Sequence, residues 1–236
     1  MKKTLKGIYL FLIVLFLYLP IFTLMVLSFN GGKTMNAWVG FSLEWYEEMF
    51  SNRQIMEALG NTLTIAFWAA AISTVIGVMA CIGINAMREK SKTILMGINN
   101  IPLLNADIVT GISLMLSFLM FGISLNYGTV LIAHVTFCIP YVILSVMPKF
   151  KQLENNTYEA ALDLGASPVY AFFKVVLPDI MPGIISGFLL AFTMSVDDFV
   201  ITHFTRGAGI NTLSTLIYSQ VRVGIRPTLY ALSTLI

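Results

Sequence analysis

The chain has 236 residues, of which 57% are hydrophobic and only 11% are charged, and its mean hydropathy is +0.83. Soluble domains carry roughly 25% charged residues, so this composition excludes a soluble globular protein. The net charge of +2 does not favour a nucleic-acid partner. We therefore expect one membrane domain over residues 1–236, built from helices that are apolar all round and contact the lipid bilayer.

The N-terminal segment begins with three lysines and continues as an apolar run over residues 8–29. This run is longer than the apolar core of a signal peptide, and no small-residue cleavage site follows it. We interpret it as an uncleaved first span whose N-terminus stays in the cytoplasm.

Further apolar runs of about 20 residues, the length that a spanning helix needs, follow along the chain. They cover residues 63–87, 103–123, 127–147 and 183–203. A sixth run begins near Thr228 and is cut short at the end of the sequence. The sequence thus predicts an all-α, polytopic transmembrane helix bundle of six spans, with the sixth truncated.

Lysine and arginine are unevenly divided between alternate loops, nine against five of the fourteen. The richer side carries Lys2, Lys3, Lys6, Arg88, Lys90, Lys92, Lys149, Lys151 and Lys174, and the other side carries Lys33, Arg53, Arg206, Arg222 and Arg226. Because cationic loops stay in the cytoplasm, this bias predicts a cytoplasmic N-terminus.

A polar segment with its own glycine and proline residues, 148–182, separates the fourth and fifth runs. Two adjacent alanines after a glutamate offer a small, flat helix surface, and the glycine that follows marks a turn before a second short helix. An ordinary helical loop is the alternative interpretation. The residues concerned are Glu159, Ala160, Ala161, Gly165, Leu177 and Pro178.

The spacing of this segment resembles the EAA motif of bacterial ABC-importer permeases, with Val175 where isoleucine is commoner. The stretches NADIVTGISLMLSF, HVTFCIPYVILSV and FTMSVDDFVITHF also resemble the C-type permeases of spermidine/putrescine importers. The resemblance implies the type I ABC-importer permease fold, with segment 148–182 as the coupling segment. It also implies the partners: a homologous second permease, two ATP-binding subunits and an extracytoplasmic polyamine-binding protein, assembled in the bacterial inner membrane.

The chain contains no G-x-x-x-x-G-K-[ST] loop. We therefore expect this chain to hold no cofactor and to perform no catalytic chemistry. ATP and Mg²⁺ are expected on the partner subunit.

Three carboxylates, Asp107, Asp197 and Asp198, lie within apolar runs, where each costs about 2.5–3.5 kcal/mol. No lysine or arginine lies in those runs, so the carboxylates carry a net negative charge that a cation such as a polyamine could neutralise. Asp198 is turned about 100° from Asp197 on a helix, so both cannot face one narrow path. The alternative is that the carboxylates are structural and are satisfied by hydroxyls or by a partner's arginine.

Two further side chains are assigned to the substrate path. Trp45, in the first outer loop, offers an aromatic face to a cation, although such residues also form interfacial belts. Ser195 is a weaker candidate, as a hydrogen-bond donor or as a helix-packing residue. His134 and His203 lack metal-ligand spacing and are interpreted as polar packing residues, so no metal site is predicted.

These observations together predict a permease subunit of an ATP-driven importer that forms, with a second permease, a membrane path for spermidine or putrescine. Three alternatives stay open: an ABC-importer permease for another small solute, a gradient-driven secondary transporter that uses the same aspartates, and a membrane scaffold.

Overall fold

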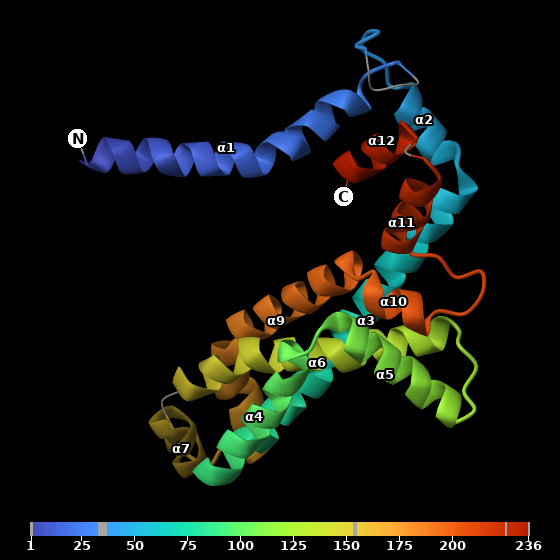
Figure 1. Ribbon diagram of the computed structural model, residues 1–236. Helices are drawn as coiled ribbons and strands as arrows, with labels where there is room; N and C mark the ends of the chain where they lie inside the picture. The colour runs from blue at the N-terminus through green and yellow to red at the C-terminus, as the bar shows by residue number, and fades with distance from the viewer. Residues whose placement is uncertain (1, 33–36, 153–154, 225, 236) are drawn as a thin grey trace. The chain divides into compact units, whose positions relative to one another are not determined.

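The computed structural model describes residues 2–32, 37–152, 155–224 and 226–235, and the regular elements of this part are all helices (Figure 1). A single antiparallel bridge pairs Asn30 with Phe41. The predicted all-α fold is therefore confirmed. The chain forms two compact units, Met1–Leu59 with Leu216–Ile236, and Gly60–Thr215, which are described separately below.

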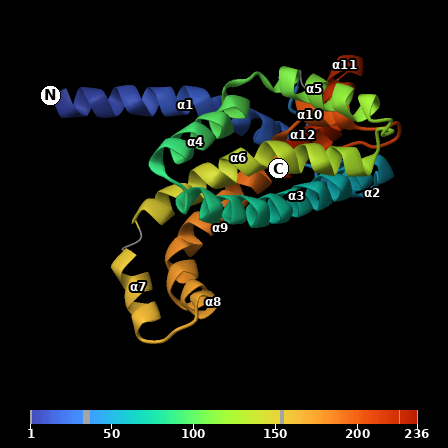
Figure 2. The ribbon, with the colours of Figure 1, turned by 90° about the horizontal axis from the view of Figure 1, so that it is seen from below.

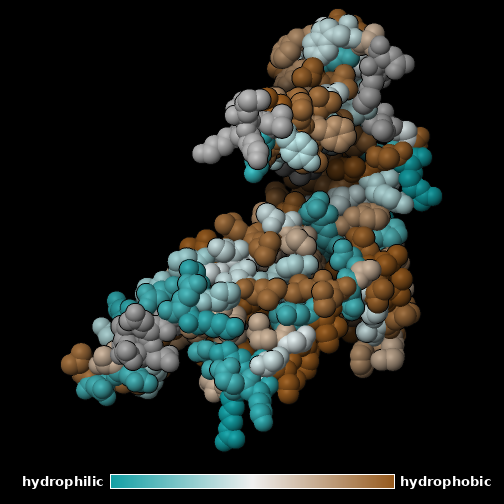
Figure 3. Space-filling view, turned by 60° about the vertical axis from the view of Figure 1, so that its left-hand side comes forward, coloured by the Kyte–Doolittle hydropathy of each residue, from teal (hydrophilic) through white to brown (hydrophobic). Residues whose placement is uncertain are grey.

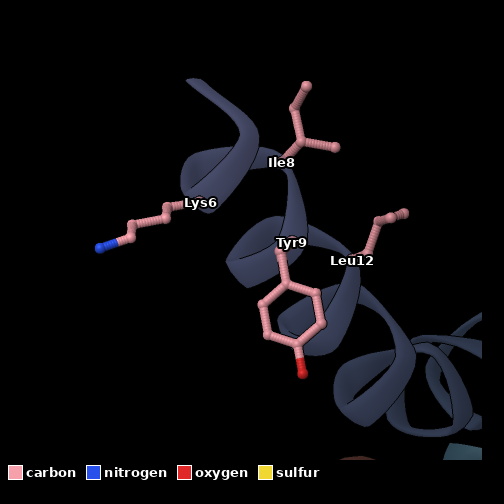
Figure 4. A pocket seen from close by; sticks show the side chains of 4 residues that line it. All are labelled: Lys6, Ile8, Tyr9 and Leu12. Carbon is pink, nitrogen blue, oxygen red and sulfur yellow. The ribbon is translucent and has the colours of Figure 1, made fainter. Parts of the chain in front are cut away.

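The first unit combines the two ends of the chain. Helix α1 (Lys2–Ser28) is about 40 Å long and exposes most of its apolar side chains, as a lipid-facing helix does. A small hollow on α1 is lined by Lys6, Ile8, Tyr9 and Leu12, which project from successive turns (Figure 4). Helix α2 runs over Glu44–Ser51, and helix α12 over Thr228–Leu235 contacts both α1 and α2.

The second unit contains the remaining helices, and its two boundaries cut α3 and α11. The helices are α3 (Arg53–Asn85), α4 (Glu89–Leu104), α5 (Asp107–Met120), α6 (Tyr127–Gln152), α7 (Asn155–Asp163), α8 (Pro168–Ala171), the π-helical turn η1 (Phe172–Val176), α9 (Leu177–Asp197), α10 (Val200–Thr205) and α11 (Leu213–Val223).

Five predicted spans correspond to apolar helices of the structure. In the described part of the chain, four helices are long and apolar enough to cross a membrane, and the bent pair α4 and α5 is a candidate fifth. Helix α12 begins at Thr228, where the truncated sixth run was predicted. The apolar runs therefore located the four helices of the described chain that are long and apolar enough to cross a membrane.

Small residues allow α9 to pack closely against α6. Gly183, Gly187, Ala191 and Ser195 recur at every fourth position and are all buried. A Cβ atom at Gly183 would lie 2.8 Å from Lys149 Cγ, and one at Gly187 would lie 3.4 Å from the Cα atom of the facing turn of α6. Without a hydrophobic force between helices in lipid, such close approach is what stabilises the pair.

The direction of each helix follows from these contacts. Tyr127 contacts Thr64 and Cys81 contacts the carbonyl of Ile143, so α3 and α6 run parallel, whereas α9 runs antiparallel to α6. The C-terminal ends of α3 and α6 therefore lie at one end of the unit, with α7 and α8 beyond them (Figure 2). Hydrophilic residues gather over the end that carries α4 and α7 (Figure 3). The cationic loop that contains Lys90 and the one that contains Lys149 were predicted to share one side of the membrane, and both lie at this end of the unit.

The cationic stretch after the second predicted span, residues 88–102, is mostly helical and belongs to α4. Charged residues in the first turns of α4 lower its hydropathy, so this helix does not form a continuous apolar run. The third predicted span is also broken, because Asn105 and Ala106 are extended and α4 and α5 meet at 101°.

The prediction of a separate short helix after Gly165, ending at Leu177 and Pro178, is wrong. Residues 168–197 form one helix, which widens into the π-helical turn just before Pro178. Proline lacks an N–H and its ring crowds the carbonyl four residues earlier in the helix. In the wider π-helical turn, the N–H of Leu177 donates to the carbonyl of Phe172, five residues earlier. At its other end α9 stops at Asp197, six residues before the predicted His203.

Candidate functional site

Asp107 lies far along the chain from Asp197 and Asp198, yet all three aspartates line one cavity. Its volume is about 220 Å³, and Asp107, Asp197 and Asp198 all contribute to its wall. The other lining residues are Phe137, Tyr141, Met194, Phe199, Val200 and Ile201. The cavity thus combines carboxylates with aromatic and aliphatic surface, all within the second unit.

Two interrupted helices create this cavity. Helix α4 ends at Leu104 and α5 begins at Asp107, and helix α9 ends at Asp197 with α10 beginning at Val200. The last carbonyls of a helix lack intrahelical donors and carry the negative end of its dipole. The end of α9 therefore adds negative potential beside Asp197, whereas the N-terminal ends of α5 and α10 place positive potential beside Asp107 and Asp198. Interrupted helices of this kind are tolerated at membrane depth where they line a cavity.

Asp107 and Asp197 differ from Asp198 in their surroundings. The first two are exposed, and within the described part of the chain neither has a hydrogen-bond or ion-pair partner. The side chain of Asp198 is only 9% exposed. It accepts hydrogen bonds from the backbone N–H of Ile201 at 3.1 Å and of Thr202 at 2.8 Å, so it caps α10. Two carboxylates are therefore free to meet a ligand, and the third is engaged by the fold.

Ser195 and His134 form a buried pair next to the cavity. Ser195 is 3% exposed and does not line the cavity, and its Oγ lies 2.6 Å from Nδ1 of His134. His134 is fully buried on α6, and its Nε2 lies 2.8 Å from Oγ1 of Thr202 and 3.4 Å from Oδ2 of Asp198. The interpretation of His134 as a polar packing residue missed this connection to the cavity.

An ionisable side chain inside an apolar run is itself a signal of function. His134 lies in the apolar run 127–147 and carries this signal as the three aspartates do. His203, the second histidine, is exposed and stacks on the ring of Phe199, with 5.3 Å between ring centroids.

Trp45 belongs to the other unit. Its side chain is 6% exposed and its indole N–H donates to the carbonyl of Asn30 at 2.7 Å. The assignment of Trp45 to the substrate path stays a prediction.

Segment 148–182 presents small and apolar surface around a tight turn. Glu159 and Ala160 are exposed on α7, and Ala161 is half-buried. Gly165 has a φ of +87°, a conformation that residues with a Cβ atom avoid, so the predicted turn is confirmed. Next to it, Leu164 is 89% exposed.

A family model for the inner membrane component of binding-protein-dependent transport systems matches residues 1–236. The chain belongs to this family. The resemblance drawn from the sequence is thereby confirmed, and this inner membrane component is a multi-pass membrane protein with several apolar helices.

Curated relatives of this inner membrane component are transport permeases. The chain is 38% identical to the spermidine/putrescine transport system permease protein PotC of Haemophilus influenzae, over 98% of this chain and 90% of that protein. It is 40% identical to the putrescine transport system permease protein PotI of Escherichia coli, over 94% and 81%. It is 35% identical to PotC of Escherichia coli, over 99% and 89%.

Two solved structures share the fold of this inner membrane component. One is a bacterial ABC transporter involved in the import of the acidic polysaccharide alginate, with a TM-score of 0.75, 16% identity and coverage of 98% of this chain and 84% of that chain. The other is the MetNI methionine ABC transporter, with a TM-score of 0.63, 18% identity and coverage of 78% and 89%. At these identities the likeness concerns the fold alone, and it agrees with the predicted importer-permease fold.

Proposed function

We propose that this chain is one permease subunit of an ATP-driven polyamine importer of the bacterial inner membrane. The observation that carries the proposal is the cavity in which Asp107 and Asp197 are unpartnered beside aromatic rings. The curated relatives named for spermidine and putrescine transport support the same substrate class.

The chemistry of the cavity suits a flexible chain of methylenes with ammonium ends. An unpaired carboxylate at membrane depth is costly, and attraction to a cation offsets this cost because the low dielectric strengthens it. Phe137, Tyr141 and Phe199 offer ring faces, on which a cation gains about 0.5–2 kcal/mol and a methylene chain can lie. A neutral or anionic solute would leave both carboxylates unpaired.

The proposal assigns energy supply to other chains. Glu159, Ala160, Ala161 and Gly165 would dock on one of two ATP-binding subunits, which hold ATP and Mg²⁺, at the end of the unit where the cationic loops lie. Leu177 and Pro178, the first residues of α9, would belong to the same coupling segment. A homologous second permease would complete the path, and an extracytoplasmic binding protein would deliver the polyamine. The N-terminus would lie in the cytoplasm.

The test is ATP-dependent uptake of labelled putrescine and spermidine by the complete complex in proteoliposomes. Asp107→Asn and Asp197→Asn keep the size of the side chain and remove its charge, so each should lower putrescine uptake about tenfold or more. Glu89→Gln, which removes an acid from the first turn of α4 and not from the cavity, should leave uptake unchanged.

Three results would contradict the proposal. Uptake at the unmodified rate by the Asp107→Asn/Asp197→Asn double variant would return these acids to a structural role. Uptake of other solutes in place of polyamines would indicate an importer for another small solute. Uptake driven by an ion gradient without ATP would indicate a secondary transporter.

A further inference from the structure

His134 is the centre of a buried hydrogen-bond chain that connects three helices. Its Nδ1 lies 2.6 Å from Oγ of Ser195 on α9, and its Nε2 lies 2.8 Å from Oγ1 of Thr202 on α10. The hydroxyl of Thr202 in turn lies 2.8 Å from Oδ2 of Asp198. His134, Thr202 and Ser195 are 0%, 0% and 3% exposed, so water does not compete for these bonds.

One set of proton positions satisfies every donor and acceptor of this chain. The carboxylate of Asp198 only accepts, so the Thr202 hydroxyl donates its proton to Oδ2. The oxygen of Thr202 then accepts from His134, which requires the proton on Nε2. In the neutral ring Nδ1 is an acceptor and receives the hydroxyl proton of Ser195. A neutral imidazole therefore satisfies every member of the chain.

Asp198 is held at both oxygens by this arrangement. Oδ1 accepts from the N–H of Ile201, and Oδ2 accepts from the N–H and the hydroxyl of Thr202. The hydroxyl of Ser214 also donates to the Asp198 carbonyl at 2.6 Å, which fixes the backbone where α9 ends. The hydrogen bonds turn the carboxylate toward α10 and leave few lone pairs for a ligand.

We propose that His134, in its neutral Nε2–H form, is a positioning residue for the cavity. It ties α6 and α9 to the start of α10 and holds Asp198 in the cap, so that Asp107 and Asp197 are the two carboxylates that meet the substrate. This inference rests on the proposed function for its substrate, and it adds a division of roles among the three acids.

The decisive comparison is between His134→Gln and His134→Leu in the complete complex. The glutamine amide carries a donor and an acceptor at about the spacing of the two ring nitrogens and does not titrate, so it should keep most putrescine uptake. Leucine fills similar volume but leaves Ser195 without its partner and removes the donor to the Thr202 oxygen, so uptake should fall about tenfold or more. Membrane content and co-purification of the partner subunits are measured for both variants.

A second pair isolates the hydroxyl. Thr202→Val keeps the shape of the side chain and breaks the chain between His134 and Asp198, so it should match His134→Leu. Thr136→Val is the control, because the Thr136 hydroxyl is exposed on α6 and donates to the carbonyl of Ile132 in the same helix. It should leave uptake unchanged.

A double-variant cycle separates positioning from general packing. If His134 acts through Asp198, the His134→Leu/Asp198→Asn double variant should be no worse than the worse single variant. Additive losses would overturn the proposal, as would unchanged uptake in His134→Leu. Equal impairment of His134→Gln and His134→Leu would show that a titrating imidazole is needed and would also overturn it.

The cycle is also scored by binding-protein-stimulated ATP hydrolysis, which does not depend on the identity of the solute. A wild-type complex that transports no polyamine would therefore refute the proposed substrate, and the role of His134 would still be decided by the ATPase measurements.

Discussion

At the scale of single residues, Gly165 allows the backbone strain caused by a substitution to be distinguished from a steric clash. Its φ of +87° requires a residue that tolerates a left-handed backbone, yet among the described residues, its two chain neighbours aside, nothing lies within 4 Å of the position of a Cβ atom. The strain of a substitution therefore comes from the backbone, and any steric clash must come from another chain. The backbone conformation of the turn and the proposed docking surface can therefore be tested independently.

We expect Gly165→Asn to be tolerated better than Gly165→Val. Asparagine enters the left-handed region at low cost, whereas a left-handed conformation costs an ordinary residue roughly 1–2 kcal/mol and a β-branched residue more. The measurement is ATP hydrolysed per putrescine imported by the purified complex, which should rise for the valine variant. Equal coupling in both variants would show that the conformation of this turn does not matter.

At the scale of helices, the packing around α6 depends on glycines whose roles differ by position. On α3, a Cβ atom at Gly77 would lie 2.6 Å from Cγ1 of Val142, whereas one at Gly83 would meet nothing within 4 Å. Both glycines lie inside the same helix. The first is required by close approach to α6, and the second has no such role in this chain.

Gly77→Ala and Gly83→Ala form a matched pair on this helix. The first should destabilise the protein by about 1–3 kcal/mol through overpacking, and the second should stabilise the helix by up to about 1 kcal/mol. Thermal unfolding of the detergent-solubilised complex measures both. A lower midpoint for Gly83→Ala than for Gly77→Ala would contradict the packing described for α3 and α6.

The sequence predicted the long helices and the turn of the coupling segment because each has a local cause. Apolar runs report burial in lipid, and Gly165 reports its own backbone. The two helix breaks carry only the weak local signals of single turn and cap residues, Asn105 and Asp198, over which a hydropathy window averages.

The convergence of Asp107 with Asp197 on one cavity, and the contact of His134 with Thr202, join segments that are distant along the chain. Such contacts depend on how α5, α6, α9 and α10 pack, and spacing within a single run cannot indicate them. The division of roles between the free acids and Asp198 was likewise only suggested by the angle between neighbouring helical positions.

At the scale of the whole molecule, charge distribution and helix direction agree about the two ends of the second unit. The ends of α3 and α6 that lie beside α7 carry the cationic loops. The opposite end carries the contacts of Asn61 with Asn211 and of Thr129 with Thr205. Since cationic loops are retained in the cytoplasm, the first end should face inward.

Single cysteines test this orientation. Lys90→Cys should react with a membrane-impermeant maleimide only in inside-out vesicles, and Ala208→Cys only in intact cells, because both positions are exposed and lie at opposite ends. The unsubstituted chain is the control, since its two cysteines, Cys81 and Cys138, are buried. The reverse labelling pattern would invert the orientation.

The helix from Pro168 to Asp197 has a mechanical consequence. It connects the turn at Gly165 to a carboxylate of the cavity, and its course includes the π-helical turn Phe172–Val176 and Pro182. Wider turns and prolines are the places where helices bend. A movement received at the Gly165 turn would therefore reach Asp197 through a helix that bends most easily near its first turns, and one residue inserted between them would rotate Asp197 by about 100° relative to that turn.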